Sequence, residues 1–455
     1  MSQTIAAIST PLAPAGLGVL RLSGEQALAI ADRVFRPLHP EKSLSKLAGY
    51  TALYGHVADE DGDIDDCVAL VFRAPHSYTG EDVVEFSCHG GLYLLQRVLR
   101  ALLQAGARPA EAGEFTRRAF VNGKMDLTRA EAVMELIAAN GRLAAKTALA
   151  AREGAIFRRL DGVKQALLGA AANFSAFVDY PDDDIPELHT DELSATLEQA
   201  AHTLQALLAT FDAGRVVREG IDTVIVGAPN VGKSTLMNLL AGCERSIVTP
   251  IEGTTRDVVE ETIRLGDVLL RLADTAGIRT TEDVVETIGV QRAFARMETA
   301  ALVLAVFDGS RPLTEDDRRL AQTAAQQTAV AVINKADQAF LIGEQYIRDL
   351  FQQVVVISAA TGEGLSALEA AVRRVTGVEA LDEAQPVLAT ERQRDCVRRC
   401  LEAVQEAQQA LAAGLTLDAV SVSVDDAISA VLELTGERAT EAVVQEIFAR
   451  FCVGK

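Results

Sequence analysis

The chain has 455 residues, of which 49% are hydrophobic, so it can fill more than one core and two or three domains are expected. Its net charge of −21 argues against a surface devoted mainly to nucleic acid, because phosphate binding needs clustered Lys and Arg. Any nucleic-acid contact must therefore be confined to a small face or be shared with a partner. The sequence contains neither a basic stretch ahead of an apolar N-terminal run nor the roughly 18 to 20 apolar residues of a membrane span, so we expect no secretory signal and no membrane partner.

Residues 1–120 are expected to form an N-terminal α+β domain rich in strands. Short apolar runs bounded by Gly and Pro, such as Leu17–Leu22 and Cys67–Phe72, are typical of strands. One helix is expected around Leu92 to Leu103, directly after Gly90 and Gly91.

Residues 121–215 and 385–455 are Ala-rich and have helical periodicity. Thr128 and Glu131 have the spacing of a capping box, and apolar residues from Leu193 to Phe211 recur at intervals of three and four. The simplest interpretation is one helical domain, formed by both segments packing together, into which another domain is inserted.

Residues 216–384 alternate strands with helices. Near-continuous apolar runs, among them Val268–Leu272 and Ala329–Ile333, are typical of strands buried on both faces of a mainly parallel sheet. The predicted fold class is therefore multidomain α/β plus all-α: an N-terminal α+β domain, a helical domain, and an inserted, doubly wound P-loop domain.

The inserted segment carries four nucleotide-binding motifs in order. Gly227 to Ser234 reads GAPNVGKS, a full phosphate loop, in which backbone amides and Lys233 hold the β- and γ-phosphates. Asp274-Thr-Ala-Gly277 follows, then Asn334-Lys-Ala-Asp337 and Ser358-Ala-Ala360. The Asn-Lys-x-Asp motif indicates guanine, because its carboxylate can accept from both N1–H and the exocyclic amine. The sequence therefore predicts GTP as the ligand.

The residues expected to bind GTP come from these motifs and from the segment between the first two. They are Asn230, Val231, Gly232, Lys233, Ser234, Thr235, Thr249, Pro250, Ile251, Glu252, Gly253, Thr254, Asp274, Thr275, Ala276, Gly277, Asn334, Lys335, Asp337, Ser358, Ala359 and Ala360.

Hydrolysis needs magnesium, an oriented water and positive charge near the transferred phosphate. Ser234 and Thr255 are expected to supply hydroxyls to magnesium. Ile278 stands where many signalling GTPases have a glutamine, so Glu286 is our candidate for orienting the water, and Lys233 for stabilising charge. No arginine is placed by a motif, but the side-chain oxygen of Asn230 could hold a monovalent cation there.

These motifs, with Phe451-Cys-Val-Gly-Lys455 at the C-terminus, resemble the MnmE (TrmE) family of tRNA-modification GTPases over essentially the whole chain. Thr79 to Phe86, Cys88 to Gly91 and Gly113 to Lys124 are also similar to that family. The C-terminal motif has Val453 where the family more often has isoleucine.

The resemblance implies a potassium-activated GTPase that works through dimerisation of its GTP domains, with a constitutive homodimer held by the N-terminal domain. It also implies a role, with the FAD protein MnmG (GidA) in a heterotetramer-type complex, in placing an aminomethyl or carboxymethylaminomethyl group on C5 of the wobble uridine of tRNA. The one-carbon donor would be 5-formyl- or methylene-tetrahydrofolate.

The resemblance also implies roles for single residues. Those matching the family's potassium site are Asn230, Thr249, Ile251 and Thr254. Those matching its folate contacts are Arg21, Glu85, Lys124 and Lys455. Glu286 matches the family's glutamate that acts on the hydrolytic water.

Six cysteines without paired spacing indicate a reducing, cytoplasmic location, and Cys396 and Cys400 alone are poor evidence for zinc. Cys452 is a candidate catalytic thiol, because Lys455 could lower its pKa. The tail would have to fold back into a helical core to serve that purpose; the alternative is an inert thiol.

Two arginine clusters are candidate tRNA contacts: one comprises Arg392, Arg394, Arg398 and Arg399, and the other Arg117 and Arg118. A solvated helical face is the alternative for both. At the level of function, the alternative to a modification enzyme is a regulatory GTPase switch for ribosome or RNP assembly, because a nucleotide site does not set the output. A folate enzyme with a vestigial GTP domain fits less well, since every nucleotide motif is intact.

Overall fold

The computed structural model describes residues 3–179, 190–242, 261–272, 297–382 and 385–454. They form two compact units, one of residues 1–134 with 429–455 and the other of residues 135–428. Across these ranges, no helix has the length and apolar character needed to cross a membrane.

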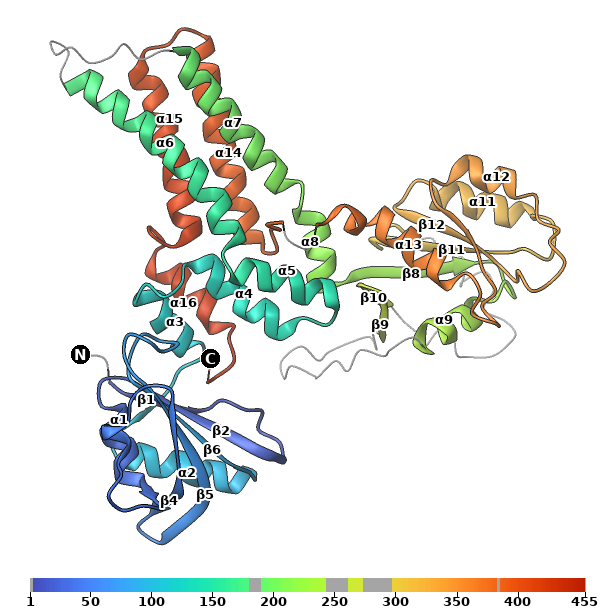
Figure 1. Cartoon of the computed structure of the whole chain (residues 1–455). Helices are drawn as coiled ribbons and strands as arrows, with labels where there is room; N and C mark the ends of the chain where they lie inside the picture. Colours follow the sequence, from blue (N-terminus) through green and yellow to red (C-terminus); the bar gives the residue numbers. More distant parts are fainter. Residues whose placement is uncertain (1–2, 180–189, 243–260, 273–296, 383–384, 455) are drawn as a thin grey trace. The chain divides into compact units, whose positions relative to one another are not determined.

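The first unit is built on a seven-stranded sheet with the strand order β3-β4-β5-β6-β2-β1-β7 (Figure 1). Its strands are β1 (Ile5–Ile8), β2 (Ala15–Ser23), β3 (Phe35–Pro37), β4 (Thr51–Asp59), β5 (Gly62–Phe72), β6 (Val83–Gly90) and β7 (Arg108–Pro109). Its helices include α1 (Ala27–Val34), α2 (Leu92–Gln104), α3 (Glu114–Val121) and α16 (Glu441–Ala449), while α4 (Leu127–Ala138) and α15 (Leu417–Thr435) run on into the second unit.

Alternation along the strands divides this sheet into two unlike faces. Leu20 and Leu22 of β2 are fully buried in a core shared with α1 and α2. Arg21, between them, points to the opposite face, as the period of two in a strand requires. On that opposite face Phe115 of α3 packs on Ile5 of β1. The predicted strands and the helix at Leu92 are confirmed; α1 and β4 were not predicted.

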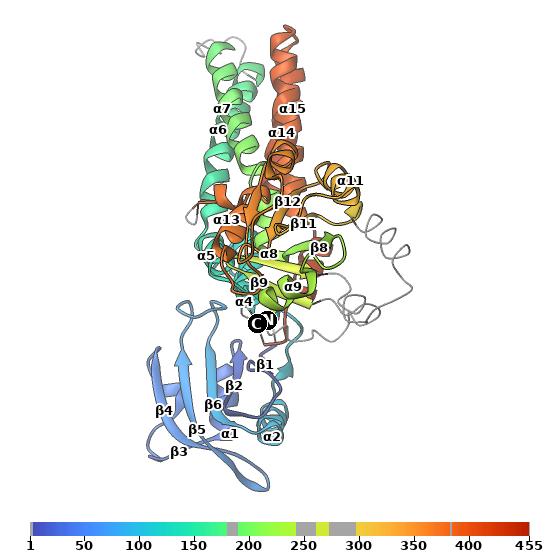
Figure 2. The same ribbon diagram turned by 90° about the vertical axis from the view of Figure 1, so that its right-hand side faces the viewer.

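The helical part of the second unit consists of α5 (Arg142–Arg152), α6 (Ala155–Asp179), α7 (Thr190–Leu208), α8 (Phe211–Glu219) and α14 (Glu391–Ala412), with the first part of α15. Figures 1 and 2 show α7 lying along α14, with α6 beside α7. A capping box starts α14, in which Thr390 accepts from the Gln393 amide and Gln393 from the Thr390 amide. Segments from both sides of the inserted domain thus pack together. The domain bounds at 120, 215 and 384 stay predictions.

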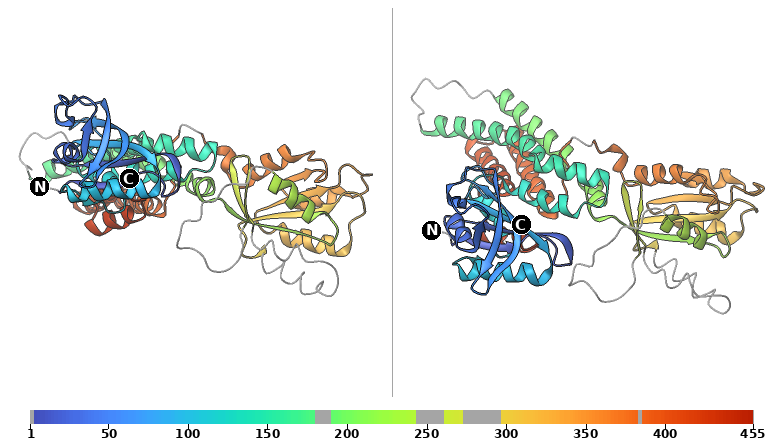
Figure 3. Two further views of the ribbon diagram at one scale, coloured as in Figure 1. Left: turned by 90° about the horizontal axis from the view of Figure 1, so that it is seen from below. Right: turned by 60° about the horizontal axis from the view of Figure 1, so that its bottom comes forward.

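The inserted part of the second unit is a six-stranded sheet with the order β13-β12-β11-β8-β10-β9, and Figure 3 shows helices on both of its faces. Its elements are β8 (Ile221–Gly227), α9 (Lys233–Gly242), β9 (Glu261–Leu265), β10 (Val268–Leu272), β11 (Leu302–Asp308), α11 (Glu315–Ala324), β12 (Ala329–Asn334), α12 (Glu344–Leu350), β13 (Val354–Val356) and α13 (Leu365–Val375). All pairings are parallel except β9 with β10. The predicted doubly wound P-loop fold is confirmed.

The start of α4 differs from the prediction. Asp126 is the capping residue, because its carboxylate accepts from the Arg129 amide at 3.0 Å and also contacts the Thr128 hydroxyl. The Thr128 side chain is buried inside the helix that it was expected to cap. An aspartate two residues ahead of a threonine is an equally good cap, so spacing alone did not locate the helix start.

Candidate nucleotide-binding site

The phosphate loop is the turn between β8 and α9. Asn230 has φ +60° and Gly232 has φ +96°, a left-handed conformation that turns successive amides toward one side of the loop. A Cβ on Gly232 would lie 2.2 Å from Nδ2 of Asn334, so this position admits only glycine without rearrangement.

Lys233 is the first residue of α9 and folds back over the loop. Its ammonium donates to the carbonyls of Gly227 at 2.9 Å and Ala228 at 2.8 Å. Burial lowers the pKa of Lys233, because removing the ammonium from water disfavours its charged form. A triphosphate beside this ammonium would therefore favour its charged form. Ser234, which follows, has an exposed side chain suited to a hard cation.

Asn334, at the end of β12, connects the phosphate loop to the guanine motifs. Its side-chain amide donates to the Val231 carbonyl at 2.9 Å and accepts from the Ala359 amide at 2.9 Å. It is 2% exposed, so both hydrogen bonds are made away from water. The phosphate loop, 103 residues before Asn334, and the Ser-Ala-Ala turn, 25 residues after it, thus meet at one buried side chain.

The other guanine-motif residues are held in place by their neighbours. Lys335 has φ +67°, and its ammonium pairs with Asp308 at 2.6 Å. The Ser358 hydroxyl donates to Asp337 at 2.6 Å and accepts from the Thr361 amide at 3.2 Å. Asp308 was not predicted; its place at the end of β11, beside the strand that carries Asn334, was the available signal.

Several residues predicted to bind GTP or its ions lie outside the described ranges. They are Thr249, Pro250, Ile251, Glu252, Gly253, Thr254, Thr255, Asp274, Thr275, Ala276, Gly277 and Glu286. Their roles stay predictions, as do the roles of the described motif residues.

The residues matched to folate contacts lie in the first unit. Arg21 and Glu85 are cross-strand partners on β2 and β6 and form an ion pair of 2.7 Å. The Arg21 guanidinium also lies 5.6 Å from the ring centres of Tyr78 and Phe115. Lys124 donates to the Pro75 carbonyl at 2.9 Å, in the same connection that carries Tyr78. Three of the four positions thus surround one connection, and Lys455 lies outside the described residues.

The last residues of the C-terminal tail lie against the segments that follow β1 and β7 of the first unit. Val453 forms an isolated bridge with Ala112, and the Gly454 carbonyl accepts from the Ser9 hydroxyl at 3.2 Å. The side chain of Cys452 is exposed. A helical core was the condition for a chemical role of Cys452, and it is met only in part: Phe451 is buried with Phe448 and Leu127, whereas Val453 and Gly454 lie outside that cluster. The role of Cys452 stays a prediction.

The two predicted arginine clusters are largely neutralised by carboxylates. On α14, Arg398 pairs with Asp395 and Glu402, and Arg399 with Asp395. Arg118 is buried and pairs with Glu81 and Glu114. These contacts favour the structural interpretation of both clusters. The thiols of Cys396 and Cys400 are buried, and burial raises the pKa of Cys400 to about 12.

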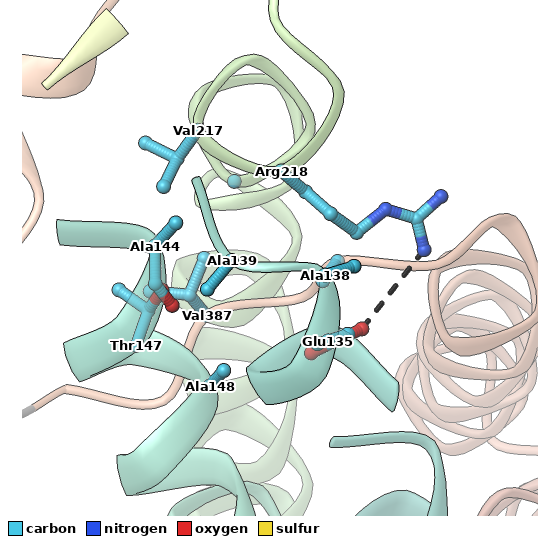
Figure 4. Close-up of a pocket in the computed structure, with 11 residues that line it drawn as sticks. Glu135, Ala138, Ala139, Ala144, Thr147, Ala148, Val217, Arg218 and Val387 are labelled. Atoms are coloured by element: carbon cyan, nitrogen blue, oxygen red, sulfur yellow. Dashed lines mark hydrogen bonds and ion pairs between the residues drawn. The ribbon is translucent and has the colours of Figure 1, made fainter. Parts of the chain in front are cut away.

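A small pocket of the second unit lies apart from the nucleotide motifs, between α4, α5, α8 and the segment that returns from the inserted domain (Figure 4). Five of its eleven lining residues are alanine, and a long ion pair of 3.9 Å joins Arg218 and Glu135 at its edge. The Gly214 Cα of α8 sits against the Leu388 carbonyl, where a Cβ would come within 2.3 Å. The pocket therefore marks where α8 and the returning segment pack together.

The phosphate loop, the Asn-Lys-x-Asp motif and the Ser-Ala-Ala turn meet at the carboxyl ends of β8, β12 and β13. Ligands bind to doubly wound sheets at this edge. Fold and site together define the class: a P-loop protein with a guanine-nucleotide site.

Comparison with known proteins identifies the family. Residues 4–124 match the model described as GTP-binding protein TrmE N-terminus, and residues 127–452 match that described as MnmE helical domain. The chain belongs to the MnmE family, which confirms the resemblance.

Individual relatives match over the full length. Proteins named tRNA modification GTPase MnmE from Symbiobacterium thermophilum and Geobacter sulfurreducens are 43% and 42% identical, and each alignment covers 100% of this chain and at least 99% of the relative. The relative of that name from Lactococcus lactis subsp. cremoris is 40% identical, with 99% of this chain and 98% of the relative covered.

Proposed function

We propose that this chain is an enzyme that hydrolyses GTP and takes part in the modification of tRNA. The observation that carries the proposal is the buried Asn334 side chain, which joins the phosphate loop to the guanine motif through two hydrogen bonds of 2.9 Å. Membership of the MnmE family, whose relatives bear the name tRNA modification GTPase over the whole chain length, supports the tRNA part.

In the proposed hydrolysis, the Lys233 ammonium leaves the carbonyls of Gly227 and Ala228 and donates to phosphate oxygens instead. Ser234 and Thr255 would bind magnesium. Magnesium supplies charge that offsets the charge of the phosphates. Glu286 orients the attacking water. Asn230 holds potassium, with Thr249, Ile251 and Thr254, where other GTPases place an arginine. The exposed position of Asn230 in the phosphate loop supports this role, because its side chain is accessible to an ion there.

The potassium role is tested by GTP turnover in potassium and in sodium. We expect turnover to be much faster in potassium, and Asn230→Ala to remove most of that difference, because the amide oxygen is the ligand lost. Asn238→Ala, an exposed asparagine on α9, is the matched control and should keep the potassium effect. Equal wild-type rates in the two salts would exclude the cation mechanism.

The modification would place an aminomethyl or carboxymethylaminomethyl group on C5 of the wobble uridine, together with the FAD protein MnmG and as a homodimer. Arg21, Glu85, Lys124 and Lys455 would bind the tetrahydrofolate donor. The Arg21–Glu85 pair supports this, because it places charge beside the half-buried ring of Tyr78, whereas Phe115 is fully buried beneath the pair. Such a surface suits a ligand with a carboxylate and an aromatic ring.

The chemical role of Cys452 is tested by mass spectrometry of nucleosides from cells whose only copy carries Cys452→Ser. We expect loss of the modified wobble uridine with GTP turnover retained. Unchanged nucleosides would exclude a chemical role for the thiol. A complete deletion that also leaves the nucleosides unchanged would favour the regulatory switch.

A further inference from the structure

The corner between α5 and α6 has a charge opposite to that of the whole molecule. Helix α5 carries three basic residues and no acidic one, whereas α7 carries three acidic residues and no lysine or arginine. From Arg142 to Lys164 there are six basic residues against Glu153 and Asp161, in a chain of net charge −21. Basic charge is therefore concentrated here against the overall trend.

Three arginines of this corner are not neutralised by carboxylates. Arg152 and Arg159 make no ion pair or hydrogen bond with any residue that the structure describes. Arg158 donates to the backbone carbonyl of Glu153 at 2.6 Å, which places it beside the end of α5, where Arg152 lies. On α14, by contrast, Arg398 has two carboxylate partners on its own helix.

The position of Arg158 and Arg159 makes their charge more costly. Both lie in or next to the first turn of α6, which contains no acidic residue. The helix macrodipole favours anions there and disfavours cations. Two cations at this end of a helix, with no carboxylate in the first turn to offset them, are unfavourable for the fold. Such uncompensated departures from local rules are expected at functional positions.

The exposed row of α6 that continues from these arginines is smooth and uncharged. Its exposed residues after Arg159 are Gly162, Gln165, Leu168 and Gly169. No atom lies within 4 Å of the Cβ position of either glycine, so a large partner can approach the helix backbone closely. Asp161, the nearest carboxylate on the helix, is paired with Lys164 at 3.4 Å.

We propose that Arg152, Arg158 and Arg159, the α5–α6 corner, bind the phosphate backbone of RNA, which under the proposed function is the tRNA substrate. Guanidinium groups bind phosphates bidentately, and such contacts hold a nucleic acid without reading its sequence. Arginine serves in both kinds of interface, but protein interfaces also rely on Trp and Tyr anchors, and the exposed row from Arg158 to Gly169 contains no aromatic residue. RNA therefore fits this corner better than a protein partner.

The test compares two triple variants of the full-length chain for binding of labelled tRNA over a series of salt concentrations. In Arg152→Ala, Arg158→Ala, Arg159→Ala, we expect affinity to fall about tenfold or more, and the slope of log K against log salt to flatten by about two to three. The matched control is Arg36→Ala, Arg348→Ala, Arg374→Ala. It removes the same charge from arginines that are paired with Asp63, Glu344 and Glu379.

Both variants should keep wild-type GTP turnover, which shows that they are folded. Equal losses in the two variants would overturn the inference, because the effect would then be one of net charge. Wild-type affinity in the corner variant would overturn it as well, and loss of binding to an FAD-containing partner instead would make the corner a protein interface. If the wild-type chain itself fails to bind tRNA, alone or with that partner, the proposed function fails first.

Discussion

At the scale of single residues, the guanine site depends on side chains that hold one another in place. The side chain of Asn334 is hydrogen-bonded to the backbone of Val231 and Ala359, so it positions the phosphate loop. Lys335 is held by Asp308. Asp337 contacts Ser358 through one carboxylate oxygen. We therefore predict that Asp337 is the residue that reads the base.

Asp337→Asn should change the base preference of the site. A carboxylate accepts from N1–H and the exocyclic amine of guanine, whereas an amide also donates, and xanthine offers a carbonyl where guanine has the amine. We expect GTP affinity to fall about 10- to 100-fold and xanthosine triphosphate affinity to rise. Competition binding measures both, with Asp349→Asn, an exposed aspartate of α12, as the control. Retained GTP selectivity would mean that the guanine contact has been misplaced.

Residue-scale expectations from the sequence succeeded where a motif fixes backbone geometry. Gly232, a glycine of the phosphate-loop motif, has φ +96°, a left-handed conformation that glycine adopts readily. Expectations failed where several nearby residues offer the same chemistry, as at Asp126 and Thr128, which can each cap α4. Pairing across strands, such as Lys335 with Asp308, has no local pattern and could not be predicted.

At the scale of elements, apolar runs located the strands of the inserted sheet because those strands are buried on both faces. All seven residues of β11 are buried. Edge strand β9 and strand β4 were missed, since exposed residues break the pattern; Tyr54 and Thr262 are not buried. Short helix α1 was missed because its eight residues span only about two turns and no capping side chain marks its start, whereas the uncapped α2 is thirteen residues long.

The start of α11 gives a pH-dependent prediction. Asp317 is 1% exposed, pairs with Arg311 at 2.7 Å and accepts from the Thr314 amide at 3.0 Å. Burial alone raises the pKa of Asp317, but the hydrogen bonds from Arg311 and Thr314 outweigh it and leave the pKa below 3.8. The ionised Asp317 carboxylate therefore stabilises the folded state. This stabilisation is fully present above the ordinary pKa of an aspartate and is lost as the pH falls through the lower pKa of Asp317 in the folded state.

Asp317→Asn should weaken α11 by roughly 1–3 kcal/mol at neutral pH, because a charged hydrogen-bonded pair is lost. Amide hydrogen exchange in Glu315–Ala324 measures local opening. The difference between variant and wild type should shrink as the pH approaches and passes below 3.8. The exposed neighbour variant Asp316→Asn should differ little from wild type at any pH. A difference that stays constant with pH would show that the ionised carboxylate contributes nothing.

At the scale of the whole molecule, the first unit is formed by the N-terminal and C-terminal segments of the chain packing together. Residues 429–455 belong to the same compact unit as residues 1–134. Phe448 and Phe451 are buried in a cluster with Leu127, and the Gly113 backbone fits against Phe448. This packing brings the exposed Cys452 next to the connection before α3, since the Gly113 amide points to the Cys452 carbonyl at 3.5 Å. Pairing of distant ends cannot be predicted from local sequence patterns.

Gly454→Ala tests whether this packing of the two segments is needed for function. Gly454 has φ +96°, and a Cβ there would lie 2.6 Å from the Ile8 carbonyl, so alanine combines backbone strain with a collision. Gly123→Ala, at φ +68° with no atom within 4 Å of the Cβ position, carries strain of about 1 kcal/mol but no collision. We expect Gly454→Ala to expose the tail to carboxypeptidase and to abolish tRNA modification while GTP turnover continues. The control should keep a protected tail and full modification. If Gly454→Ala releases the tail and modification persists, the docked tail serves stability and Cys452 acts from no fixed site.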